Sequence, residues 1–150
     1  MPDQQQAQQQ PQPGKVVYLP ATGERVLVAD DDPNIRQLLA LALHADGIEV
    51  LCAADGFELL RQAQECQPHL IVADIQMPRM DGFTAIRRLR DNQLTARIPV
   101  IILSARSSAE DVSNALEYGA DEYILKPFNL TALRSRVHAY LRQPSVETEN

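Results

Sequence analysis

Several short apolar runs of this chain end in polar residues that can bind a metal ion or take part in a reaction. The run 26–29 is followed by three consecutive aspartates, residues 30–32, and a run about forty residues later ends in Asp74. Two further apolar runs end in Ser104 and Lys126. If these runs are parallel neighbouring strands, their carboxyl ends lie at one edge of a sheet, which is where open α/β sheets bind ligands. The pattern therefore predicts a phosphoryl and metal site at this edge.

Strand-like and helix-like segments alternate five times, which predicts an α/β fold with a parallel sheet. The first helical pattern is the clearest, with apolar residues from Ile35 to Leu43 at helical spacing. Asp32 can cap this helix, Pro33 suits its first turn and Gly47 suits its exit. The later segments are expected at 49–53, 56–65, 69–73, 82–90, 100–103, a helix ended by Gly119, 123–125, and a helix capped by Asn129.

The helix after the fourth strand has its own start signal. Ser107 and Glu110 have the spacing of a capping box, in which the two side chains satisfy each other's backbone N–H groups. The sequence therefore predicts that Ser107 caps this helix.

The composition indicates one domain with polar ends. A chain of 150 residues with 45% hydrophobic residues can bury one core of ordinary size. Residues 4–13 are nearly all Gln and Pro, a composition that buries too little apolar surface to offset the entropy of ordering. We therefore expect a flexible Gln/Pro-rich tail at 1–23, one domain at 24–143 and a short polar tail at 144–150.

Net charge, hydropathy and cysteine spacing limit the binding partners and the cellular location expected for this chain. The net charge is -6, so direct nucleic-acid binding is disfavoured and a protein partner is favoured. No run approaches eighteen apolar residues, which predicts no membrane span and, by default, a cytoplasmic location. The two cysteines, Cys52 and Cys66, lack metal-site spacing and are expected to be reduced.

Taken alone, each polar residue of the predicted edge has an ordinary explanation. An aspartate after a strand can cap a helix or begin a turn. A functional site is favoured because Asp30, Asp31, Asp74, Ser104 and Lys126 all fall at the same edge. Two carboxylates roughly 5 Å apart repel by around 3 kcal/mol at an effective dielectric constant of about 20. A divalent cation would offset this repulsion.

The ligand atoms favour Mg²⁺ over softer metals. Only oxygen ligands are offered, and Mg²⁺ binds through one or two carboxylates together with substrate phosphate. With Lys126 and Ser104 available to hold phosphoryl oxygens, the set is equipped for phosphoryl transfer onto a carboxylate. Asp74 is the candidate nucleophile.

Four separated motifs resemble, in order, the receiver domain of two-component response regulators. The resemblance covers residues 25–142, with thirty residues from Asp74 to Ser104 and twenty-two from Ser104 to Lys126. It implies a flavodoxin-like (βα)5 fold, a doubly wound sheet of five parallel strands in the order 2-1-3-4-5. The motifs are Val-Ala-Asp30-Asp31-Asp32-Pro33, Ile-Val-Ala-Asp74-Ile-Gln-Met-Pro78-Arg-Met-Asp-Gly82, Ile-Leu-Ser104-Ala105-Arg, and Ala-Asp-Glu-Tyr123-Ile-Leu-Lys126-Pro127-Phe128.

The resemblance also implies a role for each acidic residue. Asp74 is expected to accept a phosphoryl group from a sensor histidine kinase, from a histidine phosphotransfer protein, or from a small donor such as acetyl phosphate. Asp31 and Asp74 are expected to bind Mg²⁺, and Asp30 is expected to support it. The main-chain carbonyl of Gln76 is expected to complete the protein ligands.

The other residues of the four motifs are expected, from the resemblance, to respond to the phosphoryl group. Lys126 pairs first with Asp74 and then with this group, and the Lys126–Pro127 bond is expected to be cis, which is rare for X-Pro bonds. Ser104 moves to a phosphoryl oxygen and Tyr123 rotates inward behind it. Arg106, like Gln76, lies where the family tunes the lifetime of the aspartyl phosphate, in a direction that the sequence leaves open. The output is a changed surface around the fourth helix, fifth strand and fifth helix, read by an unknown protein.

Other functions remain as alternatives. The chain could be the receiver fragment of a longer transcriptional regulator, or a receiver that binds partners without phosphorylation. An aspartyl-phosphate phosphatase of the haloacid dehalogenase type is disfavoured, because Gln76 stands where such enzymes need a second Asp. We therefore predict that the protein is not an enzyme, apart from the phosphorylation and dephosphorylation of its own aspartate.

The expected assembly is a monomer. Winged-helix members of the family dimerise through charge pairs, and two of the matching positions hold Val112 and Ala132 in this chain. Asp121, Glu122 and Arg136 remain. We therefore expect a largely monomeric unphosphorylated protein and at most a weak phosphorylation-dependent dimer.

Overall fold

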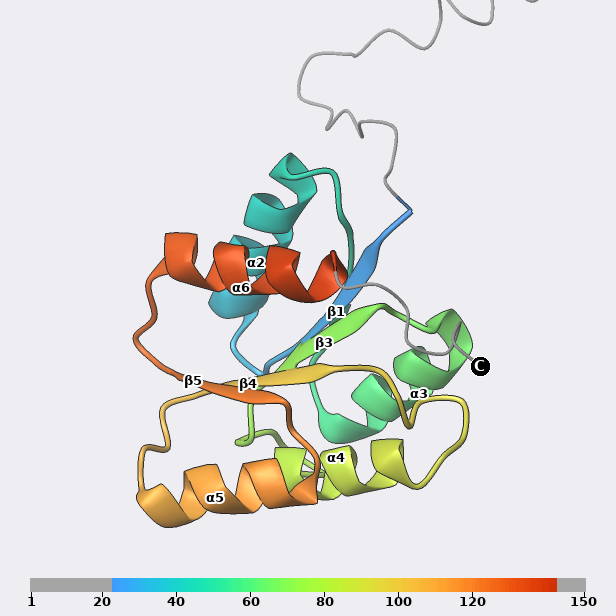
Figure 1. Cartoon of the computed structure of the whole chain (residues 1–150), viewed down its shortest axis with the longest axis vertical. Coiled ribbons are helices and arrows are strands. Elements are labelled where there is room, and N and C mark those ends of the chain that lie inside the picture. Colours follow the sequence, from blue (N-terminus) through green and yellow to red (C-terminus); the bar gives the residue numbers. More distant parts are fainter. Residues whose placement is uncertain (1–22, 143–150) are drawn as a thin grey trace, which may run out of the picture.

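Five parallel strands with helices on both faces form the fold (Figure 1). The computed structural model describes residues 23–142. Its strand order is β2-β1-β3-β4-β5, so the predicted α/β class and the order 2-1-3-4-5 are confirmed. The predicted tails lie outside the described residues, apart from Gly23.

The elements follow the predicted alternation, with ends that differ by a residue or two from the expected ones. They are β1 (Arg25–Ala29), α2 (Pro33–Ala45), β2 (Glu49–Ala53), α3 (Gly56–Cys66), β3 (Leu70–Ala73), α4 (Gly82–Arg90), β4 (Val100–Ser104), α5 (Ala109–Tyr118), β5 (Glu122–Leu125) and α6 (Leu130–Leu141). Among the described helices, none is long and apolar enough to cross a membrane.

The strand register brings the polar ends of the strands together. Ala29 at the end of β1 is opposite Ala73 at the end of β3, so Asp30 and Asp74 leave the sheet side by side. The Asp74 N–H donates to the Ala29 carbonyl at 2.9 Å. On the other side of β3, Ser104 of β4 is opposite Leu125 of β5, directly before Lys126.

Both faces of the sheet are covered by apolar side chains, as the parallel strands require. Alternate residues of β1 point to opposite faces: Leu27 and Ala29 belong to one core, Val26 and Val28 to the other. Helices α3, α4 and α5 cover the first face, and α2 and α6 cover the second (Figure 1). This packing holds the strand ends in a fixed relation to one another.

The predicted start of the helix after the fourth strand is wrong by one residue. Ser108, not Ser107, caps α5, and its Oγ accepts from the Asp111 N–H at 3.0 Å. Both serines can cap a helix, so local chemistry did not distinguish them. In the structure the Asp111 N–H reaches the Ser108 hydroxyl, while the Asp111 carboxylate is held by Arg106 from the loop after β4. The caps predicted at Asp32 and Asn129 are confirmed.

Candidate functional site

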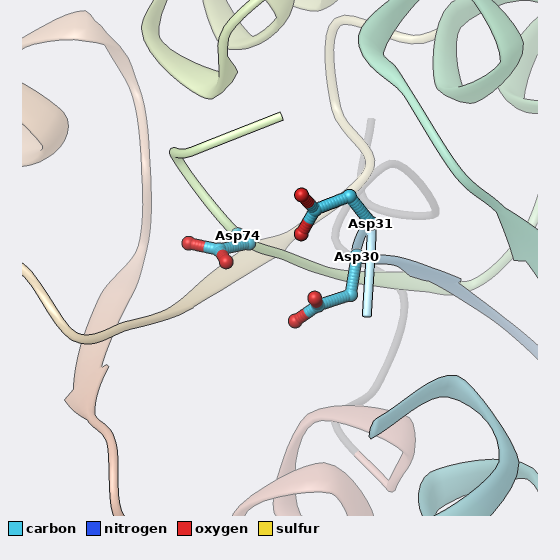
Figure 2. A group of neighbouring side chains, drawn as sticks. All are labelled: Asp30, Asp31 and Asp74. Atoms are coloured by element: carbon cyan, nitrogen blue, oxygen red, sulfur yellow. The ribbon is translucent and has the colours of Figure 1, made fainter. Parts of the chain in front are cut away.

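Three carboxylates gather at the carboxyl ends of β1 and β3. Asp30 and Asp31 follow β1, Asp74 follows β3, and one carboxylate oxygen of each lies within 4.8 Å of the other two. Figure 2 shows Asp30 and Asp31 projecting from neighbouring backbone toward the side on which Asp74 lies. Asp30 is 2% exposed and Asp74 is 5% exposed, whereas Asp31 faces solvent. Two of the three charges are therefore largely removed from water.

Lys126 bridges the two buried carboxylates. Its Nζ donates to Asp30 Oδ2 at 2.8 Å and to Asp74 Oδ2 at 3.0 Å. The pairing with Asp74 was expected from the family resemblance, but the pairing with Asp30 was not predicted. The Lys126–Pro127 peptide bond is cis, as expected. The backbone N–H of Lys126 donates to the Ser104 carbonyl at 2.9 Å, which anchors its main chain to the end of β4.

Burial and pairing act on the charges of this group in opposite senses. Burial raises the pKa of Asp30, and the hydrogen bond from Lys126 only partly offsets this effect. For Lys126 itself, burial disfavours the charged form, but the hydrogen bonds to Asp30 and Asp74 outweigh it, and its pKa is raised. The ammonium group therefore stays charged at neutral pH.

The donor set fits a hard divalent cation. Three carboxylates face one ammonium group, so the fully ionised cluster carries an excess of two negative charges. All the ligand atoms are oxygens, which suits Mg²⁺ better than the metals that prefer His or Cys. The Gln76 N–H donates to Asp74 Oδ1 at 3.2 Å, which holds Gln76 in the turn after Asp74. A metal-binding role for the Gln76 carbonyl stays a prediction.

Ser104 and Tyr123 meet through the loop after β4. The buried Ser104 Oγ accepts from the Arg106 N–H at 3.1 Å. The Tyr123 hydroxyl donates to the Arg106 carbonyl at 2.6 Å. Burial raises the pKa of Tyr123, and the negative charge of Asp74 contributes to the same shift. The two predicted switch residues are therefore joined through the backbone of Arg106, and their switching roles stay predictions.

Sequence reasoning missed two residues that position the cluster. Arg36 donates from Nη1 to the Asp30 carbonyl at 2.7 Å and so holds the main chain next to the carboxylates. Gly82 packs against the strand end, because a Cβ there would lie 2.6 Å from the Asp74 carbonyl oxygen and 2.7 Å from Ile75 Cα. Gly82 was visible as part of a motif, whereas the position of Arg36 in α2 carried no signal in the sequence.

The charged residues expected at a dimer interface are paired within the chain. Arg90 contacts Asp121 at 3.2 Å. Arg136 binds Glu122 through both Nε and Nη2, and the Tyr140 hydroxyl donates to the same carboxylate at 3.0 Å. These internal contacts compete with pairing across an interface. The predicted monomer stays a prediction.

Comparison with known proteins agrees with this geometry. Residues 26–138 match the response regulator receiver domain. The chain is 48% identical over 124 residues to the transcriptional regulatory protein PrrA of Mycobacterium tuberculosis, covering 81% of this chain and 52% of PrrA. This chain thus spans about half the length of the curated relatives it matches.

Solved structures give the same result. The receiver domain of Francisella response regulator 1452 has a TM-score of 0.74 and 38% identity, covering 80% of this chain and 98% of that one. The receiver domain of the Pseudomonas aeruginosa sensor histidine kinase PA1611, which has a magnesium ion coordinated in its active site cleft, has a TM-score of 0.75 and 28% identity, covering 81% of this chain and all of that one. The chain therefore belongs to the response regulator receiver family.

Proposed function

We propose that this receiver domain accepts a phosphoryl group on Asp74 in a Mg²⁺-dependent reaction. The donor is a sensor histidine kinase or a histidine phosphotransfer protein, and the product switches the binding of a downstream protein partner. The observation that carries the proposal is the buried Asp74 carboxylate. It is hydrogen-bonded to Lys126 within a cluster that carries more negative than positive charge. A carboxylate held in this way is fixed in position for in-line attack and has a cation beside it for the arriving charge.

Each residue of the site has a defined part in this transfer. Asp31, Asp74 and the Gln76 carbonyl would hold Mg²⁺, with Asp30 in support, and the ion would neutralise charge on the phosphoryl oxygens. The Asp74 carboxylate forms the new P–O bond as the P–N bond to the donor histidine breaks. Lys126, already 3.0 Å from Asp74, then pairs with a phosphoryl oxygen.

The switch follows from the charge that this reaction adds. A phosphoryl group brings additional negative charge and acceptor oxygens to Asp74. The Ser104 hydroxyl can donate to one of these oxygens, and Tyr123 follows because its hydroxyl bonds to the loop that carries Arg106. We place the resulting change on the face formed by α5, β5 and α6, which are the fourth helix, fifth strand and fifth helix along the chain. A protein partner would bind this face.

Two alternatives remain, and a specific observation favours the first. Curated relatives are transcriptional regulators about twice as long as this chain, which favours a receiver that serves as the input part of a longer regulator. A receiver that binds partners without phosphorylation would keep the same fold and leave Asp74 unused. Neither alternative requires catalysis on a separate substrate.

The test is the intact mass of the protein after incubation with Mg²⁺ and acetyl phosphate. We expect a labile gain of one phosphoryl group that is lost in Asp74→Asn and lost when EDTA removes the metal. Asp81→Asn is the matched control, because Asp81 lies in the same loop but caps α4 with its side chain. Labelling that persists in Asp74→Asn would disprove the proposed acceptor. If acetyl phosphate and a purified kinase both fail to label the chain, the phosphorylation-independent alternative is favoured.

A further inference from the structure

Arg106 joins more elements around the site than any role proposed above requires. Its Nε and Nη2 donate to the Asp111 carboxylate at 3.2 and 3.1 Å. Its guanidinium carbon lies 5.7 Å from the centre of the Phe83 ring. Its backbone N–H binds Ser104 and its carbonyl binds Tyr123. One residue thus touches β4, α4, α5 and β5.

The backbone of Arg106 is anchored beside Ser104, the residue proposed to donate to a phosphoryl oxygen, because the Arg106 N–H donates to Ser104 Oγ at 3.1 Å. Phe83, beneath the guanidinium, directly follows Gly82, which packs against the Asp74 carbonyl. The Tyr123 hydroxyl donates to the Arg106 carbonyl, and the pKa of Tyr123 is raised mainly by burial, with a smaller contribution from the negative charge of Asp74. Arg106 is therefore in direct contact with Ser104, Phe83 and Tyr123, and its flexible side chain starts next to the residue proposed to bind the phosphoryl group.

Asp111 is held firmly as a partner for Arg106. It lies in the first turn of α5, and its N–H donates to the Ser108 cap. The hydrogen bonds from Arg106 and Ser108 lower the pKa of Asp111. The carboxylate is therefore ionised at neutral pH, and the amino end of the helix favours a negative charge at this position.

We propose that Asp111 and a phosphoryl group on Asp74 compete for the Arg106 guanidinium, which makes Asp111 a positioning residue that weakens the phosphorylated state. This inference rests on the proposed function of Asp74. A guanidinium fork forms paired hydrogen bonds equally well with a carboxylate or with phosphoryl oxygens, and one fork cannot fully serve both. Since coupling between two sites is reciprocal, an anion on Asp74 loosens the Arg106–Asp111 pair and so reaches the first turn of α5.

The competition is tested with beryllium fluoride, which mimics the phosphoryl group without being hydrolysed. NMR titration of the full chain at saturating Mg²⁺ gives the affinity of wild type and of Asp111→Asn. We expect about two- to five-fold tighter binding in Asp111→Asn, the range for loss of a solvent-exposed ion pair. In an Arg106→Gln background, the same Asp111→Asn change is expected to have no effect, because the effect acts through Arg106.

Glu110→Gln is the matched control. Glu110 precedes Asp111 in the same first turn, and the described residues show no ion pair between Glu110 and Arg106. We expect this variant to bind beryllium fluoride as wild type does. An equal gain in Glu110→Gln, or in Arg106→Gln/Asp111→Asn relative to Arg106→Gln, would assign the effect to general charge and overturn the competition.

The remaining outcomes separate this inference from the proposed function. Unchanged or weaker binding in folded Asp111→Asn overturns the competition and leaves the role of Asp74 intact. If wild type neither binds beryllium fluoride nor accepts phosphate, the role of Asp74 fails and the competition fails with it. If circular dichroism shows that Asp111→Asn is unfolded, Asp111→Ser provides a second neutral variant, with the same result expected.

Discussion

Two clusters of charged side chains lie at opposite edges of the same sheet and are built in different ways. At the carboxyl edge, Lys126 is shared between the buried Asp30 and Asp74. At the amino edge of β4 and β5, the Arg90 guanidinium faces Asp121. The first cluster has more negative than positive charge, whereas the second is balanced.

In the balanced cluster, most hydrogen bonds of the Arg90 guanidinium go to the backbone. Arg90 donates to the carbonyls of Gly119, Ala96 and Ile98 at 2.7 to 3.1 Å and to Asp121 at 3.2 Å. The Asp121 carboxylate also accepts from the Val100 N–H at 2.8 Å. Arg90 thereby ties the end of α4 to the loops that precede β4 and β5.

The difference separates a structural cluster from a functional one. Burial of charge is tolerated when the charges are paired and hydrogen-bonded, as they are around Arg90. The carboxyl edge keeps an excess of negative charge in a partly buried place, which costs stability unless a cation binds. Such an imbalance is typical of functional sites, where affinity for a ligand outweighs stability of the free protein.

The largest effect is expected from Arg90→Met. The change leaves three carbonyls without their Arg90 donors and removes the cationic partner of Asp121, so we expect the free energy of unfolding to fall by about 3 kcal/mol. Urea unfolding followed by circular dichroism measures this loss. Arg90→Lys keeps the charge and is expected to lose less. A loss below about 1 kcal/mol in Arg90→Met would show that this cluster is not a structural tie.

The next effect has the opposite sign and belongs to the carboxyl edge. Asp74→Asn removes one carboxylate from a repelling set, so in EDTA we expect the free energy of unfolding to rise by about 1 kcal/mol. Mg²⁺ at ten times its dissociation constant is expected to stabilise wild type by about 1.4 kcal/mol and the variant by less. Thermal unfolding with and without Mg²⁺ measures both. Equal stabilisation of the two proteins would contradict a metal site at Asp74.

A third cluster tests the balanced arrangement through pH. Asp46 at the end of α2 binds Arg134 of α6, with Nε 3.1 Å from Oδ2, and His138 of α6 at 2.9 Å. The hydrogen bond from Arg134 is the main cause of the lowered pKa of Asp46. A lowered pKa contributes stability that is present above the ordinary aspartate pKa and is lost as the pH falls through the lowered one.

Asp46→Asn is therefore expected to be destabilising near neutral pH only. We expect a loss of about 1 kcal/mol there, a modest value because the Arg134 side chain is 39% exposed. Below about pH 4, the ordinary aspartate pKa, the difference from wild type should shrink. Urea unfolding at both pH values measures the two differences. A difference that does not change with pH would point to packing rather than charge.

The smallest effect is expected from a charge pair without burial. Arg61 and Glu65 of α3 are 3.5 Å apart, and both side chains are more than half exposed. Glu65→Gln should change the free energy of unfolding by about 0.3 kcal/mol, because water screens the pair. Chemical unfolding of this variant beside Asp46→Asn provides the comparison. A larger loss than in Asp46→Asn would mean that burial is not what separates these clusters.

Much of the site could be predicted because it depends on strand ends. A parallel sheet brings the carboxyl ends of its strands together, so Asp30, Asp74, Ser104 and Lys126 could be grouped from four short patterns. Helix caps at Asp32 and Asn129 could be predicted because they need only neighbouring residues.

Contacts that depend on side-chain reach could not be predicted in this way. In the sequence, Arg36 looks like any charged residue of a helix, and only the folded structure shows that it donates to the Asp30 carbonyl. Ser107 and Ser108 have the same capping chemistry, and the path of the loop after β4 decided between them. Such choices depend on distances across the fold, which a local pattern does not contain.

The sequence by itself determined the α/β class, the acidic edge and the family, because periodic apolar segments and the residues that end them are local properties of the chain. Only the tertiary structure decided how the charges are shared. It placed Lys126 between two carboxylates, directed Arg106 to Asp111 and gave Arg90 its carbonyl partners. Long side chains have several partners within reach, and only the packed positions of the helices and strands select among them.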